Sequence, residues 1–95
     1  MRVLLTGASG LLGGYVMHEL KSRGLEAVGW PGPQSRLGST LYSTAGDLGD
    51  PEWVSAAFRA AGPKLLIHAG ALSSVDACYR DPDKARQVNT LGTWQ

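Results

Sequence analysis

The sequence lacks most of the features that identify a secreted, membrane or metal-binding protein. Its 95 residues hold a single cysteine, Cys78, which cannot form a disulfide within the chain and which fits a reducing compartment. No apolar run approaches the roughly 18 residues of a membrane span. The apolar start of the chain lacks the longer hydrophobic region and the cleavage site of a signal peptide. We therefore expect one soluble, cytoplasmic domain.

An excess of charge of one sign is also missing. Nine Lys and Arg residues stand against eight Asp and Glu residues, which gives a net charge of +1. This balance provides no basic field for nucleic acid and no acidic tail for a basic partner. Cys78 has no histidine or other metal ligand at a useful spacing, so we expect an inert thiol and no metal site.

What is present is a repeated alternation of apolar strands and amphipathic helices. Strands are predicted at 3–6, 25–29, 41–45 and 64–69, and helices at 11–23, 51–61, 75–80 and from 82 onward. Leu12, Val16 and Leu20 are expected on the buried face of the first helix, and Val54, Ala57, Phe58 and Ala61 on that of the second. Asp50-Pro51 and Asp81-Pro82 are typical helix starts.

This alternation predicts an α/β fold with a parallel sheet covered on both faces. Right-handed crossovers favour half of a doubly wound sheet of about four strands in the order 3-2-1-4. The last helix shows no stop signal before Gln95, so we expect the domain to be incomplete there. The strand at 64–69 would then be an open apolar edge, which favours self-association of the chain.

A glycine-rich turn joins the first strand to the first helix. Gly7 permits the tight turn, Gly10 lets the backbone approach a pyrophosphate, and Gly13 lets the helix pack closely. The amides near Leu11 and Leu12 would then point at the phosphates, assisted by the helix dipole. A glycine turn without a ligand is the alternative, but its position between an apolar strand and an amphipathic helix favours dinucleotide binding.

The end of the second strand bears on the choice of cofactor. An NAD-binding site usually places an acid there for the ribose 2′-hydroxyl. This strand ends Val28-Gly29-Trp30-Pro31, without an acid, and Arg36 follows in the loop. A guanidinium can pair with a 2′-phosphate, so we predict NADP in preference to NAD. The alternative is that Arg36 is one solvated loop charge.

The turn from Thr6 to Gly13 resembles the T-G-x-x-G-x-x-G fingerprint of the extended short-chain dehydrogenases/reductases, which have a Rossmann fold. Asp47-Leu48 resembles their acidic dipeptide, whose carboxylate contacts the adenine amino group. His68-Ala69-Gly70-Ala71 is similar to the segment that passes along the cofactor ribose, and Val88 to Thr93 is similar to a V-N-x-x-G-T helix. The cofactor-binding residues predicted are Gly7, Ser9, Gly10, Leu11, Leu12, Gly13, Arg36, Asp47, Leu48, Ala69, Gly70 and Ala71.

Two further segments are similar to the dTDP-4-dehydrorhamnose reductase branch, namely 70–76 and 81–85. The resemblance implies an NAD(P)-dependent oxidoreductase acting on a nucleotide-linked sugar, of which these residues form the dinucleotide-binding part. Three alternatives remain open. They are a non-catalytic NADP-binding regulatory subunit similar to that of methionine adenosyltransferase, an epimerase or dehydratase of the same family, and a truncated product without activity.

The family's proton donor is a tyrosine with a lysine four positions later. Tyr15, Tyr42 and Tyr79 all lack that lysine, so we expect no catalytic residue in these 95 residues and an inactive chain. The catalytic Tyr/Lys segment and the substrate domain are expected beyond residue 95. His68 is expected to pack with one ring nitrogen hydrogen-bonded, and Asn89 to bond backbone near Ala69. Asp76 is expected either to cap the turn at Val75 or to shape the substrate side of the site.

Overall fold

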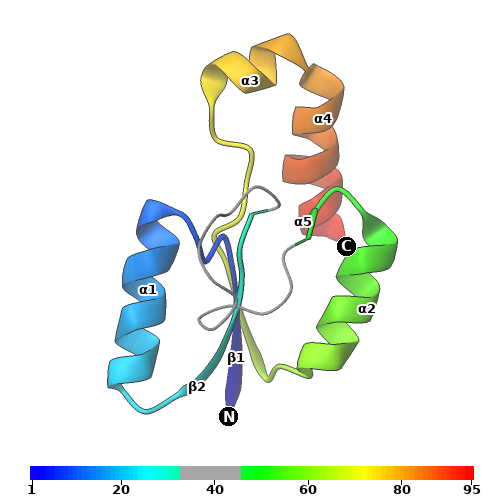
Figure 1. The fold of residues 1–95 in the computed structure, drawn as a ribbon. Coiled ribbons are helices and arrows are strands. Elements are labelled where there is room, and N and C mark those ends of the chain that lie inside the picture. The colour runs from blue at the N-terminus through cyan, green and yellow to red at the C-terminus, as the bar shows by residue number, and fades with distance from the viewer. Residues whose placement is uncertain (33–45) are drawn as a thin grey trace.

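The computed structural model describes residues 1–32 and 46–95, which form a parallel sheet with helices on both faces (Figure 1). The strands are β1 (Arg2–Thr6), β2 (Glu26–Trp30) and β3 (Leu65–His68), in the order β2-β1-β3. The helices are α1 (Leu11–Ser22), α2 (Pro51–Ala61), α3 (Val75–Arg80), α4 (Pro82–Arg86), the π-helical turn η1 (Gln87–Leu91) and α5 (Gly92–Trp94).

The predicted α/β class and parallel sheet are confirmed. Both neighbours of β1 run parallel to it, with Leu4 paired to Val28 on one side and to Leu66 on the other. The strand predicted at 41–45, and Arg36, lie outside the described residues. Strand β3 is the fourth of the predicted strands, at 64–69. The observed order β2-β1-β3 is therefore the 2-1-4 part of the predicted order 3-2-1-4.

Successive residues of β1 build two separate cores, because neighbouring side chains of a strand point to opposite faces. Leu4 packs with Trp30 and Val54 on the face covered by α2. Leu5 packs with Ala8 and Met17 on the face covered by α1. Figure 1 shows the two helices on either side of the sheet. This double burial explains why the apolar run of β1 is continuous rather than alternating.

Helix α1 buries the predicted face only in part: Leu20 is buried as predicted, and Leu12 is not. Leu12 is 67% exposed, and the buried residues of the helix are Gly13, Met17 and Leu20. Val16 is only partly buried. The first turn of α1 buries Gly13 in place of Leu12. Gly13 has no side chain, and its backbone lies directly against the glycine turn. Met17 follows Gly13 by one turn and packs with Leu5 and Ala8.

The second helix follows its prediction more closely. Asp50 caps it by accepting hydrogen bonds from the amides of Glu52 and Trp53, and Pro51 occupies the first turn. Val54 and Ala61 are buried. Phe58 was predicted on the same face but is 41% exposed, because it projects past the sheet at the edge formed by β3.

Strand β3 is less buried than its apolar sequence predicts. Leu65 and Leu66 are each 46% exposed, because β3 pairs with β1 on one side only within the described residues. This placement agrees with the predicted apolar edge. Among the described helices, none is both long and apolar enough to cross a membrane.

The C-terminal segment begins as predicted and then departs from a regular α-helix. Asp81 caps α4 by accepting a hydrogen bond from the Lys84 amide. Ser74 caps α3 through the Ala77 amide, so the cap is not Asp76, which instead pairs with Arg80. Between α4 and α5 the chain makes one π-helical turn, which the sequence pattern did not predict.

Candidate functional site

The glycine turn closes tightly against the end of β3. Gly7 has φ +69°, a conformation that favours glycine. A Cβ added there would lie 2.5 Å from the carbonyl oxygen of Ala69 and 2.8 Å from the amide nitrogen of Gly70. A Cβ at Gly13 would lie 1.9 Å from the Gly7 carbonyl oxygen. The two glycines therefore bring the turn, the start of α1 and the segment after β3 into backbone contact.

The first turn of α1 has no side-chain cap. Gly10 is its N-cap residue and provides no hydrogen-bonding side chain, whereas α2, α3 and α4 are capped by Asp50, Ser74 and Asp81. The first amides of a helix have no partner inside the helix. At α1 these amides, together with the positive end of the helix dipole, are available to an anion.

A cavity of about 820 Å³ lies beside this turn, at the carboxyl ends of the strands. All the predicted cofactor residues within the described part of the chain line it: Gly7, Ser9, Gly10, Leu11, Leu12, Gly13, Asp47, Leu48, Ala69, Gly70 and Ala71. Side chains that were not predicted for the site complete the wall, among them Thr6, Trp30, Lys84 and Val88.

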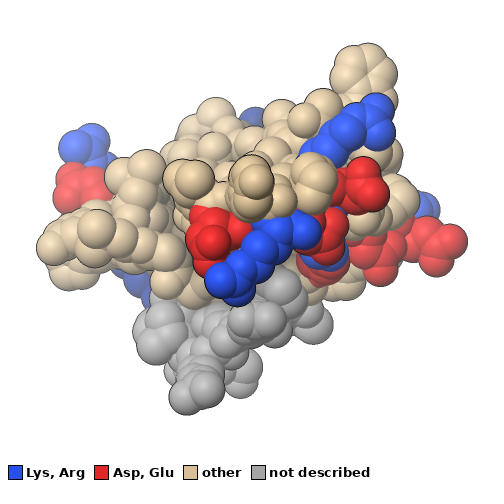
Figure 2. All heavy atoms as spheres, turned by 90° about the horizontal axis from the view of Figure 1, so that it is seen from above, with Lys and Arg blue, Asp and Glu red and all other residues tan. Residues whose placement is uncertain are grey.

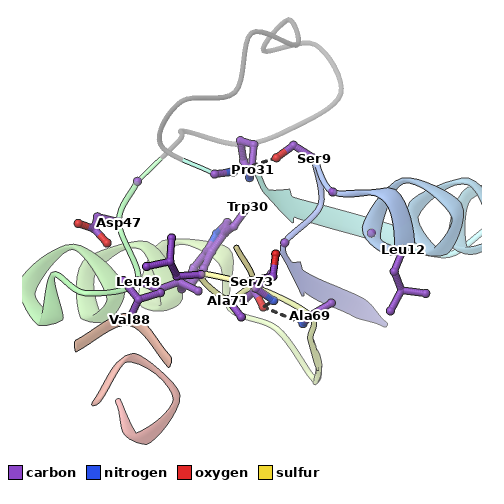
Figure 3. A pocket seen from close by; sticks show the side chains of 18 of the residues that line it. Ser9, Leu12, Trp30, Pro31, Asp47, Leu48, Ala69, Ala71, Ser73 and Val88 are labelled. Atoms are coloured by element: carbon purple, nitrogen blue, oxygen red, sulfur yellow. Dashed lines mark hydrogen bonds between the residues drawn. The ribbon is translucent and has the colours of Figure 1, made fainter. Parts of the chain in front are cut away.

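Figure 3 shows how the ends of this cavity differ. Ser9 and Leu12 lie at the end formed by the glycine turn, and Asp47 lies at the opposite end, with Leu48 and Val88 on the same side as Asp47. Ser9 Oγ accepts a hydrogen bond from the Gly32 amide at 3.0 Å, which ties the glycine turn to the segment after β2. One end thus offers backbone amides and the other a carboxylate, with apolar side chains beside it.

Asp47 is held in place by two hydrogen bonds. Its Oδ1 accepts from the Gly49 amide at 2.8 Å, and its Oδ2 accepts from Lys84 Nζ at 2.5 Å. The hydrogen bond from Lys84 lowers the pKa of Asp47 below its ordinary value; partial burial opposes this shift and the Gly49 amide adds to it. Asp47 is therefore ionised at neutral pH and acts only as an acceptor.

Thr6, the last residue of β1, fixes the backbone that follows β3. Its Oγ1 accepts hydrogen bonds from the amides of Ala69 and Gly70, both at 3.0 Å. Thr6 is 3% exposed, and Ala69 and Gly70 are partly buried. The hydroxyl thereby fixes the backbone that was predicted to run along the cofactor ribose. From the sequence alone, Thr6 has no predicted role beyond the turn motif, because hydrogen bonds to residues far along the chain leave no local pattern.

His68 makes two hydrogen bonds rather than the one predicted. Its Nδ1 lies 2.6 Å from Thr6 Oγ1 and its Nε2 lies 2.9 Å from Thr93 Oγ1. Because Thr6 Oγ1 already accepts from two amides, its own hydrogen goes to Nδ1, and Nε2 then carries the ring proton. Thr93 passes its hydrogen to the carbonyl of Asn89, at 2.8 Å.

The segment after β3 is fixed by the C-terminal helices. Asn89 Oδ1 accepts from the Leu72 amide at 2.7 Å and Asn89 Nδ2 donates to the Leu72 carbonyl at 3.0 Å. The predicted backbone bonding of Asn89 is therefore present, three residues beyond Ala69. Cys78 is a free thiol whose Sγ donates to the same carbonyl. This chain of contacts supports the cavity wall from outside.

The aromatic residues divide between packing and solvent. Trp30 and Trp53 pack with ring centroids 4.8 Å apart. Trp94 is 85% exposed. Tyr15 and Tyr79 are also exposed, and neither lines the cavity.

Charge around the site is mixed. Seen from above the strand ends, the Lys and Arg side chains of the described residues lie beside their Asp and Glu side chains and form no extended patch of one sign on this face (Figure 2). Within residues 1–32 and 46–95, no three His, Cys, Asp or Glu side chains form a group that could hold a metal.

The model of a family described as the RmlD substrate binding domain matches residues 1–95. The spore coat polysaccharide biosynthesis protein SpsK of Bacillus subtilis is 29% identical over 93 residues, which are 98% of this chain and 29% of that protein. This chain therefore spans less than a third of the length of that relative.

Solved structures share the fold. UDP-glucose 4-epimerase of Thermus thermophilus, in complex with NAD, matches with a TM-score of 0.82 and 32% identity, over 99% of this chain and 32% of the other. A hypothetical dTDP-4-dehydrorhamnose reductase from Sulfolobus tokodaii matches with a TM-score of 0.80 and 29% identity, over 97% of this chain and 32% of the other.

Proposed function

The chain belongs to the RmlD family of extended short-chain dehydrogenases/reductases, and on that premise we propose that its cavity binds an NAD(P) dinucleotide. The whole protein would be a sugar-nucleotide reductase, for which these residues supply the cofactor site. The observation that carries the proposal is the start of α1, which has no side-chain cap and lies at the cavity wall. Gly7 and Gly13 allow this start to pack closely on the glycine turn.

The residues present fit such a cofactor. The amides of Leu11 and Leu12 would hold the pyrophosphate, since backbone donors at a helix start suit a dianion and no side chain occupies them. Asp47, an ionised acceptor at the other end of the cavity, would accept from the adenine amino group. The backbone from Ala69 to Ala71, fixed by Thr6, would run along the ribose.

We propose NADP rather than NAD as the preferred dinucleotide. The residues that follow β2 at the cavity are Pro31 and Gly32, and they provide no carboxylate to hold a ribose 2′-hydroxyl. Arg36 would pair with the 2′-phosphate instead.

The bound dinucleotide supplies a hydride; the residues of this chain bind and orient it. Of the three tyrosines, none has a lysine four positions later. We propose that the tyrosine and lysine that move the proton, and the residues that select the sugar, belong to other parts of the whole protein. On this proposal the 95-residue chain binds cofactor but does not turn over substrate by itself.

A second candidate function is epimerisation of a nucleotide-linked sugar. It is favoured by the similarity to the Thermus thermophilus epimerase, and it would use the same dinucleotide site. An epimerase removes a hydride from the sugar and then returns it, whereas a reductase transfers a hydride from NADPH to a keto sugar and leaves NADP. Assay of the whole protein for net oxidation of NADPH by a 4-keto nucleotide-sugar distinguishes them, because an epimerase consumes no NADPH overall.

Calorimetric titration of the chain with NADP and with NAD tests the cofactor site. We expect binding of both, with NADP the tighter, and we expect Arg36→Ala to weaken NADP about tenfold or more with little effect on NAD. Arg23→Ala removes a surface guanidinium from the far end of α1 and should change neither affinity. The absence of binding by either dinucleotide at millimolar concentration would refute the proposal, and equal losses in Arg36→Ala would refute the preference for NADP.

A further inference from the structure

Lys84 occupies a position in the cavity that the proposed cofactor roles do not use. Among the described residues that line the cavity it is the one cation, and it faces two acids, Asp47 and Asp81. Asp81 is engaged as the cap of α4. Lys84 Nζ therefore pairs with Asp47. The side chain of Lys84 is 41% exposed and that of Asp47 is 35% exposed, so both are more than half buried.

The loop around Asp47 is held by the C-terminal helices through successive contacts. Lys84 binds the side chain of Asp47, and Gln87 Nε2 donates to the Gly49 carbonyl at 2.7 Å. Gly92 packs so closely on the carbonyl of Leu48 that an added Cβ would lie 2.6 Å from its oxygen. Each residue from 47 to 49 is thus fixed by a different residue of the segment 84–92.

The π-helical turn makes this arrangement possible. Lys84 and Gln87 are three residues apart and share a face of an α-helix. Gln87 and Gly92 are five residues apart, which in a regular α-helix places them on different faces. A turn closed by i→i+5 hydrogen bonds brings that pair into line, and η1 spans Gln87 to Leu91. Single π turns of this kind are frequent at functional sites.

We propose that Lys84 is a positioning residue for adenine recognition: it fixes the Asp47 carboxylate toward the base. This inference rests on the proposed dinucleotide site. With Oδ1 bound to the Gly49 amide and Oδ2 to Lys84, the carboxylate cannot rotate freely, and each oxygen retains a lone pair for an amino group. Without Lys84 the carboxylate would keep only the hydrogen bond from the Gly49 amide and would be loosely oriented.

The test compares two ligands on matched variants of the whole 95-residue chain. One ligand is the dinucleotide that binds, NADP or NAD; the other is its analogue with hydrogen in place of the adenine 6-amino group. Because a hydrogen bond to a charged group is among the stronger ones, we expect the unchanged chain to prefer adenine by about tenfold or more. In Lys84→Met this preference should fall to about twofold or less, since only the oriented carboxylate reads the amino group.

Lys84→Arg restores a cation and should keep most of the preference. Lys21→Met removes an exposed lysine from the last turn of α1 and should leave the preference unchanged. Far-ultraviolet circular dichroism shows whether each variant folds, and if Lys84→Met does not, Lys84→Gln carries the same comparison. A purely structural role for Lys84 would weaken both ligands equally.

An undiminished adenine preference in a folded variant without the Lys84 charge would overturn the inference while leaving the proposed function standing. So would a lack of adenine preference in the unchanged chain. Failure of the unchanged chain to bind any dinucleotide would overturn the proposed function, and this inference with it.

Discussion

The packing of α1 on the glycine turn can be tested with two neighbouring glycines that differ in one respect. Gly13 is buried, and an added Cβ would lie 1.9 Å from the Gly7 carbonyl oxygen. Gly14 is the next residue of the same helix, and an added Cβ would meet nothing within 4 Å. The variants Gly13→Ala and Gly14→Ala therefore share the gain in helix propensity and differ in the steric contact.

The expected free energies follow from these contacts. Replacing glycine by alanine inside a helix stabilises it by up to about 1 kcal/mol, and Gly14→Ala should gain that amount. A carbon normally stays about 3.3–3.6 Å from a carbonyl oxygen, so α1 and the turn must separate by more than about 1 Å to accept Gly13→Ala. Overpacking of this kind costs about 1–3 kcal/mol. The difference between the two variants should therefore be about 1–3 kcal/mol in the free energy of unfolding.

Urea unfolding followed by circular dichroism measures this difference directly, and thermal unfolding should show roughly 4–8 °C for each kcal/mol in a domain of this size. Gly13→Ala should also weaken dinucleotide binding, because it displaces the first amides of α1. Equal stability of the two variants would show that α1 does not pack on the Gly7 carbonyl, and the account of the turn would then be wrong.

Three further outcomes are expected. Thr6→Val should destabilise the fold by about 1–3 kcal/mol in urea unfolding, because the Gly70 amide and His68 Nδ1 lose the hydroxyl and the Ala69 amide keeps only the Thr6 carbonyl, whereas Thr6→Ser should retain most of the stability. Asp47 has a lowered pKa, so it should stabilise the fold above its unfolded pKa near 3.9 and lose that effect as the pH falls through its folded pKa. Asp47→Asn should therefore flatten the acid side of a plot of unfolding free energy against pH. An unchanged plot would contradict the pairing of Asp47 with Lys84. Leu66→Lys, on the exposed edge strand, should reduce any self-association seen by sedimentation, and a chain that is monomeric without the change would argue against an associating edge.

Several parts of this fold were determined by the sequence alone, because their causes are local. The continuous apolar run of β1 predicts burial on both faces, and the two cores around Leu4 and Leu5 confirm it. Asp50 and Asp81 predict helix starts because their carboxylates accept from amides two or three residues away. Gly7 predicts a tight turn because it sits between a strand and a helix, and it has the expected positive φ.

Only the tertiary structure decided the features that depend on residues far apart in the chain. Lys84 reaches Asp47 across 37 positions, and Thr6 reaches His68 across 62, so no local pattern records either contact. Leu20 of α1 is buried as predicted, but Leu12 is exposed; the residue buried in the first turn is Gly13, which meets the glycine turn, and hydrophobic spacing does not show that. The π turn is likewise set by the loop that it packs on. Local hydrogen bonding and hydrophobic period fixed the elements, and packing between distant segments fixed the site.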